Sequence, residues 1–327
     1  MQRRLVLVVA AAVVVGGLAA TARADRGWAP PAGARVGPVD VAYGSFAGGI
    51  GWTRSTCEGA VLWLPGIRQR WLFHVPGPCP ATSTGRGVSA VAVSSRRIVF
   101  LSYVGGNTRE WRLWTATPTA KRPRLLRTAA ADADTPSPIL LGNGGEEGIP
   151  WAVGRDVFVL AGDGHRALTW HAPADVVALN EHSGRVAAAL ADGTVQLVPV
   201  QPSKAAVTAY ALPGAHAAQA ITGGVVIDAA DGIYLSKGSH TIRFDVPAGA
   251  RLLGYSDGWL VYASGREIHA YSYQHKQDIL ARTVRSGPVT ADADRGGMGW
   301  SNGGVLCWSI FSYLRGKPLP FSAACDS

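Results

Sequence analysis

Short runs of alternating or continuous hydrophobicity fill most of the chain. Apolar residues hold every second position at His240–Val246, Thr194–Leu197 and Glu110–Leu113. Successive side chains of a β-strand point to opposite faces, so this pattern predicts strands with one buried face. Continuously apolar runs predict strands buried on both faces, and they occur at Ile98–Leu101, Val157–Leu160 and Trp259–Tyr262. No helical periodicity with caps at both ends follows the first 24 residues, so the pattern predicts an all-β chain.

Turn residues recur at regular distances between the expected strands. The turn glycines are Gly154, Gly193, Gly232, Gly265 and Gly303, with spacings of 39, 39, 33 and 38 residues. Asp-Gly and Asn-Gly pairs at several of them favour two-residue hairpins. Two earlier hairpins are expected at Arg54–Glu58 and Gly105–Arg109, which makes seven. Each hairpin is flanked by one more strand-like segment on either side.

Four short strands per unit of about 40 residues are typical of a β-propeller blade. One four-stranded sheet cannot bury both faces alone, whereas blades stacked around an axis cover each other. The expected blades lie at residues 39–80, 86–128, 136–173, 175–213, 216–247, 250–285 and 287–321. The sequence therefore predicts a β-propeller of seven four-stranded blades. Six or eight blades, or paired β-sandwiches, are the alternatives.

The strand–turn–strand units resemble those of known exported propellers. The units at Asp192-Gly193 and Asp231-Gly232 are similar to the degenerate repeats of TolB-type and quinoprotein-like propellers. The Trp-Asp dipeptide of WD-repeat blades is absent. Since the shared motif is only a turn and a pattern, the resemblance implies an exported propeller but no functional residue.

The first 24 residues have the three parts of a secretory signal peptide. Arg3 and Arg4 precede the uncharged stretch Leu5–Ala20, and Ala22-Arg23-Ala24 offers small residues for cleavage. Leu5–Ala20 has 16 residues, fewer than the about 20 of a membrane-spanning helix. We therefore expect a signal peptide at 1–24, an N-terminal segment at 25–38, the propeller at 39–321 and a tail at 322–327, in a secreted or periplasmic protein.

Composition supports a folded body outside the signal. Charged residues make up 16% of the chain and hydrophobic ones 47%, which excludes disorder for most of it. Removal of residues 1–24 takes away three arginines and no acid, leaving 28 basic and 22 acidic side chains and a net charge of +6. No later apolar stretch is long enough to span a membrane.

Four cysteines in an exported chain indicate two disulfides. Cys57 and Cys79 lie near the start, and Cys307 and Cys325 near the end. Local pairing, 57–79 and 307–325, is the simplest arrangement, while cross-pairing would join the two ends of the chain. A zinc site is disfavoured because no C-x-x-C pair or suitably spaced histidine occurs.

Candidate chemistry is sparse, and the sequence predicts no catalytic residue, metal or cofactor. The histidines are scattered singly: His74, His165, His171, His182, His216, His240, His269 and His275. His240 and His269 fall on the polar side of their strands, which favours solvated side chains. Asp132-Ala133-Asp134 and Asp292-Ala293-Asp294 resemble fragments of calcium loops, but turn-forming aspartates are the preferred interpretation. Glu146 and Glu147, set among glycines, are interpreted as solvated.

A basic segment with interleaved tryptophans is the most distinctive stretch. It contains Arg109, Trp111, Arg112, Trp114, Lys121, Arg122, Arg124 and Arg127. Such stretches bind nucleic acid in other proteins, but anionic polymers are more plausible partners of an exported chain. The preferred interpretation is an outer strand whose charges and Pro123 prevent edge-to-edge pairing.

Two classes of function follow. The first is a non-catalytic exported propeller that binds a protein, glycan or cell-envelope component, and the second is a propeller hydrolase or lyase with a site at the central channel. Converging His, Asp, Glu or Arg side chains in the channel would distinguish the enzyme.

The cysteine count predicts that the exported protein contains no free thiol and that reduction lowers its unfolding midpoint by several degrees, since each predicted loop of about 20 residues contributes roughly 3 kcal/mol. Thiol titration of the native protein with and without reductant measures this. Four titratable thiols in the native secreted form would contradict it.

Overall fold

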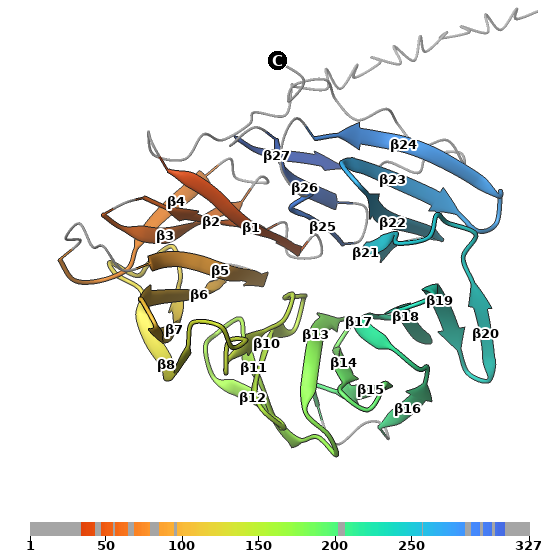
Figure 1. Cartoon of the computed structure of the whole chain (residues 1–327), viewed down its shortest axis with the longest axis horizontal. Helices are drawn as coiled ribbons and strands as arrows, with labels where there is room; N and C mark the ends of the chain where they lie inside the picture. Colours follow the sequence, from red (N-terminus) through yellow and green to blue (C-terminus); the bar gives the residue numbers. More distant parts are fainter. Residues whose placement is uncertain are drawn as a thin grey trace, which may run out of the picture.

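The computed structural model describes residues 34–310, except for residues 43–46, 55, 65–68, 79–84, 95–96, 202–206, 257, 285–288, 295–296 and 303–304. Every regular element within these residues is a β-strand, and none of them belongs to a helix that could cross a membrane. The strands form seven antiparallel sheets arranged around a common centre (Figure 1). The all-β prediction is confirmed.

The first three sheets each contain four strands. The first sheet consists of β1 (Arg35–Ala42), β2 (Ala47–Thr53), β3 (Glu58–Leu64) and β4 (Gln69–His74). The second consists of β5 (Gly85–Ser94), β6 (Arg97–Gly105), β7 (Thr108–Ala116) and β8 (Arg124–Asp132). The third consists of β9 (Leu140–Leu141), β10 (Gly148–Val153), β11 (Asp156–Ala161) and β12 (Arg166–His171).

The remaining four sheets follow in chain order. The fourth consists of β13 (Val176–His182), β14 (Arg185–Leu190), β15 (Thr194–Pro199) and β16 (Thr208–Ala211). The fifth consists of β17 (Ala215–Ile221), β18 (Gly224–Ala229), β19 (Gly232–Lys237) and β20 (His240–Arg243). The sixth consists of β21 (Arg251–Ser256), β22 (Trp259–Ser264), β23 (Glu267–Ser272) and β24 (Gln277–Thr283). The seventh consists of β25 (Ala291–Asp294), β26 (Gly297–Asn302) and β27 (Val305–Ile310).

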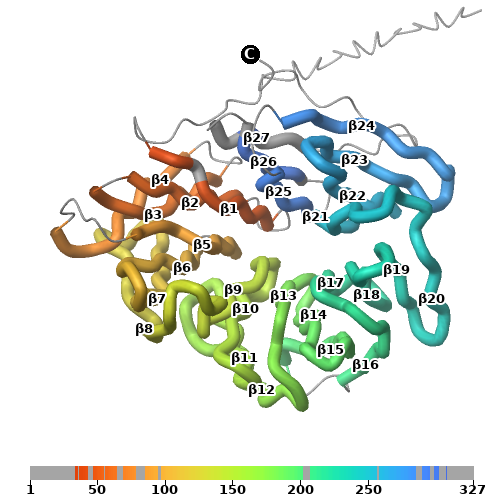
Figure 2. The backbone as a smooth tube through the Cα atoms, viewed as in Figure 1, coloured from red at the N-terminus to blue at the C-terminus, as the bar shows by residue number. Residues whose placement is uncertain are grey.

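The first strand of each sheet is the innermost, and the chain steps outward from it strand by strand (Figure 2). All seven predicted hairpins connect the second and third strands of a sheet. Two boundaries differ from expectation: β1 begins at Arg35, inside the predicted N-terminal segment, and β9 is only two residues long. The fourth strand predicted for the last unit falls outside the described residues.

The core is divided among the interfaces between consecutive sheets. Ile98 and Phe100 of the second sheet pack against Leu62 of the first, and Leu260 of the sixth sheet packs against Val226 of the fifth. Four further buried clusters likewise combine side chains of two successive sheets. The six interfaces between consecutive sheets from the first to the seventh are therefore apolar and buried, as the continuously apolar runs predicted.

The first and last sheets are also neighbours in space. β1 lies against β25 and β26, and the Val41 N–H donates a hydrogen bond to Asp292 Oδ2 at 3.0 Å. Trp52 and Trp300, of the first and seventh sheets, are among the largest fully buried side chains.

The cysteine pairing stays a prediction. Cys57 lies just before β3, and Cys307 is buried in β27. No cysteine in the described part of the chain is a free thiol. Cys79 and Cys325, the other two predicted disulfide cysteines, lie outside the described residues.

The basic segment forms the outer edge of the second sheet. Arg124 and Arg127 lie in β8, the last strand of that sheet, and Lys121 and Arg122 precede it. All four side chains are exposed, and so is Leu125. Trp111 and Trp114 of the segment are instead buried, and the Trp114 Nε1–H donates to Ser102 Oγ. The tryptophans are therefore unavailable for stacking on nucleic-acid bases.

Charges on an exposed edge strand disfavour pairing with a second molecule. We expect the double substitution of Arg122 and Arg124 by Val to promote concentration-dependent aggregation, measured by light scattering, while the monomer keeps its unfolding midpoint within about 1 °C, since surface changes cost little. An unchanged aggregation rate would contradict the edge interpretation.

Candidate functional site

The innermost strand of each sheet has a hydrogen-bonding neighbour on only one side. Its N–H groups that point away from that neighbour need other acceptors, because a buried unpaired N–H is costly. Within the described residues, five of them are satisfied by side chains of the sheet before, the seventh sheet preceding the first. Val88 donates to Thr53 Oγ1 (3.2 Å) and Leu252 to Asp228 Oδ2 (2.8 Å), and the other three share one geometry. The pairs are Val41 with Asp292 Oδ2 (3.0 Å), Val93 with Asp40 Oδ2 (2.6 Å) and Tyr255 with Gln219 Oε1 (2.6 Å).

The three acceptors occupy equivalent positions. Each lies two residues before the end of the innermost strand of its sheet: Asp40 in β1, Gln219 in β17 and Asp292 in β25. The side chains of a strand alternate between its faces, so this position points toward the following sheet. The structure thus repeats one device, an acceptor on one inner strand that receives the N–H of the next.

The third and fourth sheets meet by a different route. Asn143, just after the short β9, forms a parallel bridge with Asn180 of β13. Its N–H donates to the Leu179 carbonyl oxygen, and its own carbonyl oxygen accepts from the Glu181 N–H. A Cβ on Gly142 or Gly144 would overlap backbone atoms of neighbouring strands. The glycines around Asn143 therefore allow the chain to approach the centre closely.

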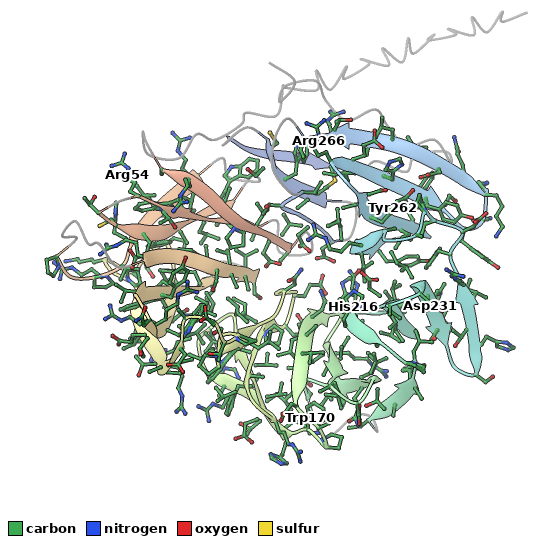
Figure 3. All side chains as sticks on the ribbon, in the orientation of Figure 1. Arg54, Trp170, His216, Asp231, Tyr262 and Arg266 are labelled. Atoms are coloured by element: carbon green, nitrogen blue, oxygen red, sulfur yellow. The ribbon has the colours of Figure 1, made fainter. Side chains whose placement is uncertain are left out.

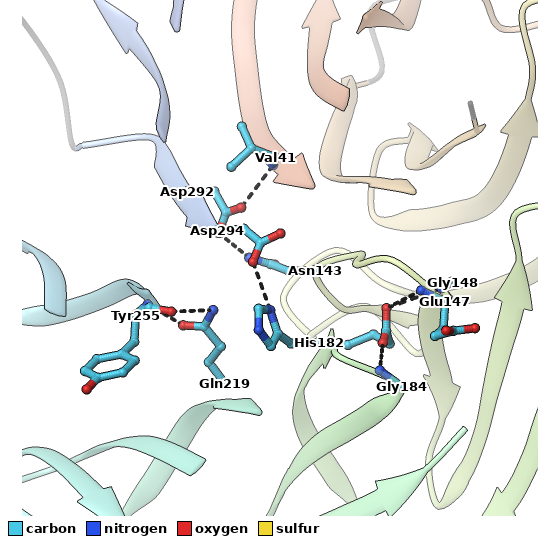
Figure 4. A network of polar contacts seen from close by, with 11 residues as sticks. Val41, Asn143, Glu147, Gly148, His182, Gly184, Gln219, Tyr255, Asp292 and Asp294 are labelled. Atoms are coloured by element: carbon cyan, nitrogen blue, oxygen red, sulfur yellow. Dashed lines mark hydrogen bonds and ion pairs between the residues drawn. The ribbon is translucent and has the colours of Figure 1, made fainter. Parts of the chain in front are cut away.

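Polar contacts also cross the centre (Figure 4). The Asn143 Nδ2–H donates to Asp292 Oδ1 at 2.6 Å, and the Gly144 N–H donates to Asp40 Oδ2 at 3.3 Å. His182 Nδ1 lies 2.9 Å from Asp294 Oδ1. These contacts tie the third and fourth sheets to the first and seventh. We call Asp40, Asn143, His182, Asp292 and Asp294 the central cluster.

The four ionisable members of the central cluster are deeply buried. Asp40 is 0% exposed, Asp292 5%, Asp294 7% and His182 8%. Burial, and then repulsion by Asp292, raise the pKa of Asp40 well above its ordinary value. Burial likewise raises the pKa of Asp292 to about 7, although the Val41 N–H and Asn143 favour its charged form. The centre therefore holds carboxyl groups that resist ionisation.

Glu181 is a separate buried carboxyl beside the central cluster. It accepts N–H groups from Glu147 (3.0 Å), Gly148 (3.3 Å) and Gly184 (2.9 Å). Burial raises its pKa to about 7, against the opposing effect of these donors. Glu181 fastens the loop before β10 to the fourth sheet, so its role is to hold backbone.

The interpretation of Asp292 and Asp294 as turn-forming residues is wrong. Both lie within β25 and face the centre. Asp132 and Asp134 do flank a turn, at the end of β8. In sequence, Asp-Ala-Asp alternates with the period of a strand, and that signal could have placed the second pair correctly. His182 was also missed, because a single histidine at the end of a strand carries no motif.

The other sequence-predicted residues lie away from the centre. His240 and Glu147 are exposed, whereas His269 is only 16% exposed and stacks on Tyr262. Figure 3 shows Tyr262 on the sixth sheet. Within the part of the chain that the structure describes, no three His, Cys, Asp or Glu side chains are placed to hold a metal ion.

Two cavities share Val177, and the smaller of them is also lined by Asn143 of the central cluster. The first, of about 230 Å³, is lined by inner-strand residues of four sheets, among them Leu140, Leu179, Leu252, Asn143 and Gln219. The second, of about 510 Å³, lies between the fourth and fifth sheets. It is bordered by Asp192 and by His216, whose Nε2 lies 3.6 Å from Asp228 Oδ1 (Figure 3). Val177, 42% exposed, belongs to both cavities. We call the surface formed by Val177 and the residues that line these two cavities the Val177 face.

Comparison with solved structures identifies the fold. A chain of the mitotic checkpoint complex matches with a TM-score of 0.55 and 12% identity, over 87% of this chain and 94% of that one. The WD40 β-propeller domain of Doa1 matches with a TM-score of 0.54 and 14% identity, over 88% and 96%. The β-propeller domain of Cps50 (Swd1) from Myceliophteria thermophila matches with a TM-score of 0.51 and 10% identity, over 86% and 97%.

The fold is a β-propeller. At sequence identities this low, the similarity shows the backbone fold alone. The chain adopts this fold although it lacks the Trp-Asp dipeptide of WD repeats. No family model and no curated protein matches the sequence. The narrower resemblance to TolB-type and quinoprotein-like propellers stays a prediction.

Removing one inter-sheet acceptor tests the repeated device. In Gln219→Leu, the buried Tyr255 N–H loses its acceptor, at a cost of about 1–3 kcal/mol, or several degrees in the unfolding midpoint. Gln277→Leu, at an exposed position at the start of β24, is the matched control and should leave the midpoint unchanged. Equal midpoints for the two variants would show that the hydrogen bond carries no stability.

Proposed function

We propose that the mature protein is an exported, non-catalytic, seven-bladed propeller that binds a protein partner through the Val177 face. Export rests on the signal-peptide pattern of residues 1–24. Seven blades rest on the seven sheets and on the contact of the first with the last through Val41 and Asp292. The fold class alone assigns no function, so the surface must supply the argument.

The state of the central carboxyl groups favours binding over catalysis. The criterion that would distinguish an enzyme is a set of acid–base side chains that converge at the channel. Such side chains do converge, but Asp40 and Asp292 accept hydrogen bonds from the chain's own backbone and are at most 5% exposed. A general acid or base must come within hydrogen-bond reach of a substrate. This burial is the observation that carries the proposal.

The Val177 face has the features of a protein-binding surface. The smaller cavity is lined by aliphatic side chains and three amides, and none of its described lining residues is charged. An exposed aliphatic residue between two hollows is suited to an apolar anchor of a partner. A glycan or an anionic envelope polymer is the alternative, and the exposed arginines of β8 and the net charge of +6 favour it.

A charge on this face tests the proposal. The mature protein is immobilised, and partners are captured from an envelope extract of the source cells and identified by mass spectrometry. Val177→Asp should reduce capture of the main protein partner at least about tenfold, because it places a charge in an apolar contact.

Val207→Asp is the matched control, since Val207 is 46% exposed but lies before the outer strand β16. It should capture the partner like the wild type. Equal capture by the two variants would overturn the Val177 face. Loss of binding to anionic polymer on replacing Arg124 and Arg127, with no protein partner found, would favour the envelope polymer instead. Hydrolysis or elimination of a glycan by the wild type would favour the enzyme.

A further inference from the structure

The two innermost carboxyl groups of the first and seventh sheets act on one another. Asp40 and Asp292 are at most 5% exposed. Beyond the effect of burial, the charge of Asp292 raises the pKa of Asp40, and hydrogen bonding from Asp40 favours the ionised form of Asp292. Asp292 accepts from Val41, the residue after Asp40, and the consecutive residues Asn143 and Gly144 donate to Asp292 and to Asp40. The two carboxyl groups are therefore neighbours, and the arrangement resembles the like-charge carboxyl pairs that retain one proton.

The donors around the pair leave one oxygen atom unmatched. Asp40 Oδ2 accepts from the Val93 and Gly144 N–H groups. Asp292 Oδ2 accepts from the Val41 N–H, and Asp292 Oδ1 from Asn143. Asp40 Oδ1 is buried and has no donor among the described residues. A buried carboxylate oxygen without a donor is costly, but the same atom carrying a proton becomes a donor itself.

The charged groups that face the pair do not neutralise it. Asp294 adds a third negative charge beside both carboxyl groups. His182, from β13, contacts Asp294, and Glu181 of the same strand points to backbone N–H groups. Among the described residues, the side chains that shift the pKa of Asp40 or Asp292 include no lysine or arginine.

We propose that Asp40 and Asp292 share one proton, held on Asp40 Oδ1 and donated to Asp292, and that loss of this proton weakens the contact between the first and last sheets. No bond other than O–H is made or broken, since the proton passes between Asp40 and solvent. With the proton present, every oxygen of the pair has a partner. Without it, two buried anions lie side by side at the point where the first and last sheets meet.

The direction of the pH dependence follows from the raised pKa values. A carboxyl group whose pKa is raised on folding binds more protons in the folded state than in the unfolded state. Its contribution to folding stability is therefore complete below the ordinary pKa and is lost as the pH rises through the folded-state pKa. For Asp292 this window runs from about pH 4 to about pH 7. Asp40, whose pKa is also raised, acts in the same direction. The contact of the first and last sheets is thus stronger in acid than in alkali.

Asp40→Asn tests the shared proton because an amide mimics the protonated carboxyl group. Its oxygen can accept from Val93 and Gly144, and its NH₂ group can donate to Asp292. The unfolding midpoints of wild type and variant are compared at about pH 5 and at about pH 9, because the raised pKa values of both groups mean that the folded pair loses protons only as the pH rises above the ordinary carboxyl range. The variant's midpoint relative to the wild type should rise by several degrees between the two pH values. Comparing differences cancels Glu181 and every other carboxyl group common to both proteins.

Asp134→Asn, in the exposed turn after β8, is the matched control, and its difference from the wild type should not change with pH. A constant difference for Asp40→Asn would overturn the proposal. An infrared carbonyl band of a protonated carboxylic acid should be present in the wild type at about pH 6 and weaker in Asp40→Asn, which separates the pair from Glu181. An equally strong band in the two proteins would also overturn the proposal. So would a calcium- or magnesium-dependent rise in the wild-type midpoint at about pH 8 that EDTA reverses and Asp40→Asn abolishes, because a cation would then replace the proton.

The proposal is independent of the Val177 face. Loss of partner capture in Val177→Asp leaves the shared proton untouched, and a failed proton test leaves the partner-binding proposal in place.

Discussion

The whole arrangement depends on how the inner edges of the sheets are satisfied. A sheet that points its first strand at a common centre exposes a row of N–H groups there, and no further strand is available to pair with them. Three of the inner strands carry a side-chain acceptor that reaches the next sheet, as Asp40 does for Val93 and Gln219 for Tyr255. The same bond joins the last sheet to the first through Asp292.

The use of Asp40 and Asp292 as acceptors places ionisable groups at a buried centre, where the charged form of a carboxyl group has a high free energy. Carboxylates are strong acceptors of backbone N–H groups, but several of them at one buried centre repel each other. The result is the raised pKa of Asp40 and Asp292. Groups that are occupied in this way are poor candidates for catalysis, and the exposed apolar surface around Val177 is the more accessible part of the molecule. The proposed shared proton follows from the buried carboxyl groups at the centre, and the proposed binding function follows from the exposed apolar surface around Val177.

Much of the fold was accessible from the sequence because turns and apolar runs are local signals. Gly193 and Gly232 marked hairpins between the second and third strands correctly, and Ile98–Leu101 proved buried. The centre was not accessible in this way. Asp40 and Asp292 are 252 residues apart, and nothing local in the sequence indicates that they meet. Asp292 was instead assigned to a turn, because an aspartate near a glycine satisfies turn statistics equally well.

Amide hydrogen exchange at Val41 tests the central claim most directly. In β1 this N–H points away from β2, and Asp292 of the last sheet is its acceptor. If the sheets close on each other, the Val41 amide should exchange only on global unfolding, as slowly as the equivalent Val93 and Tyr255 amides. Rapid exchange at Val41 while Val93 and Tyr255 stay protected would mean that the first and last sheets are apart in solution, and it would contradict the account.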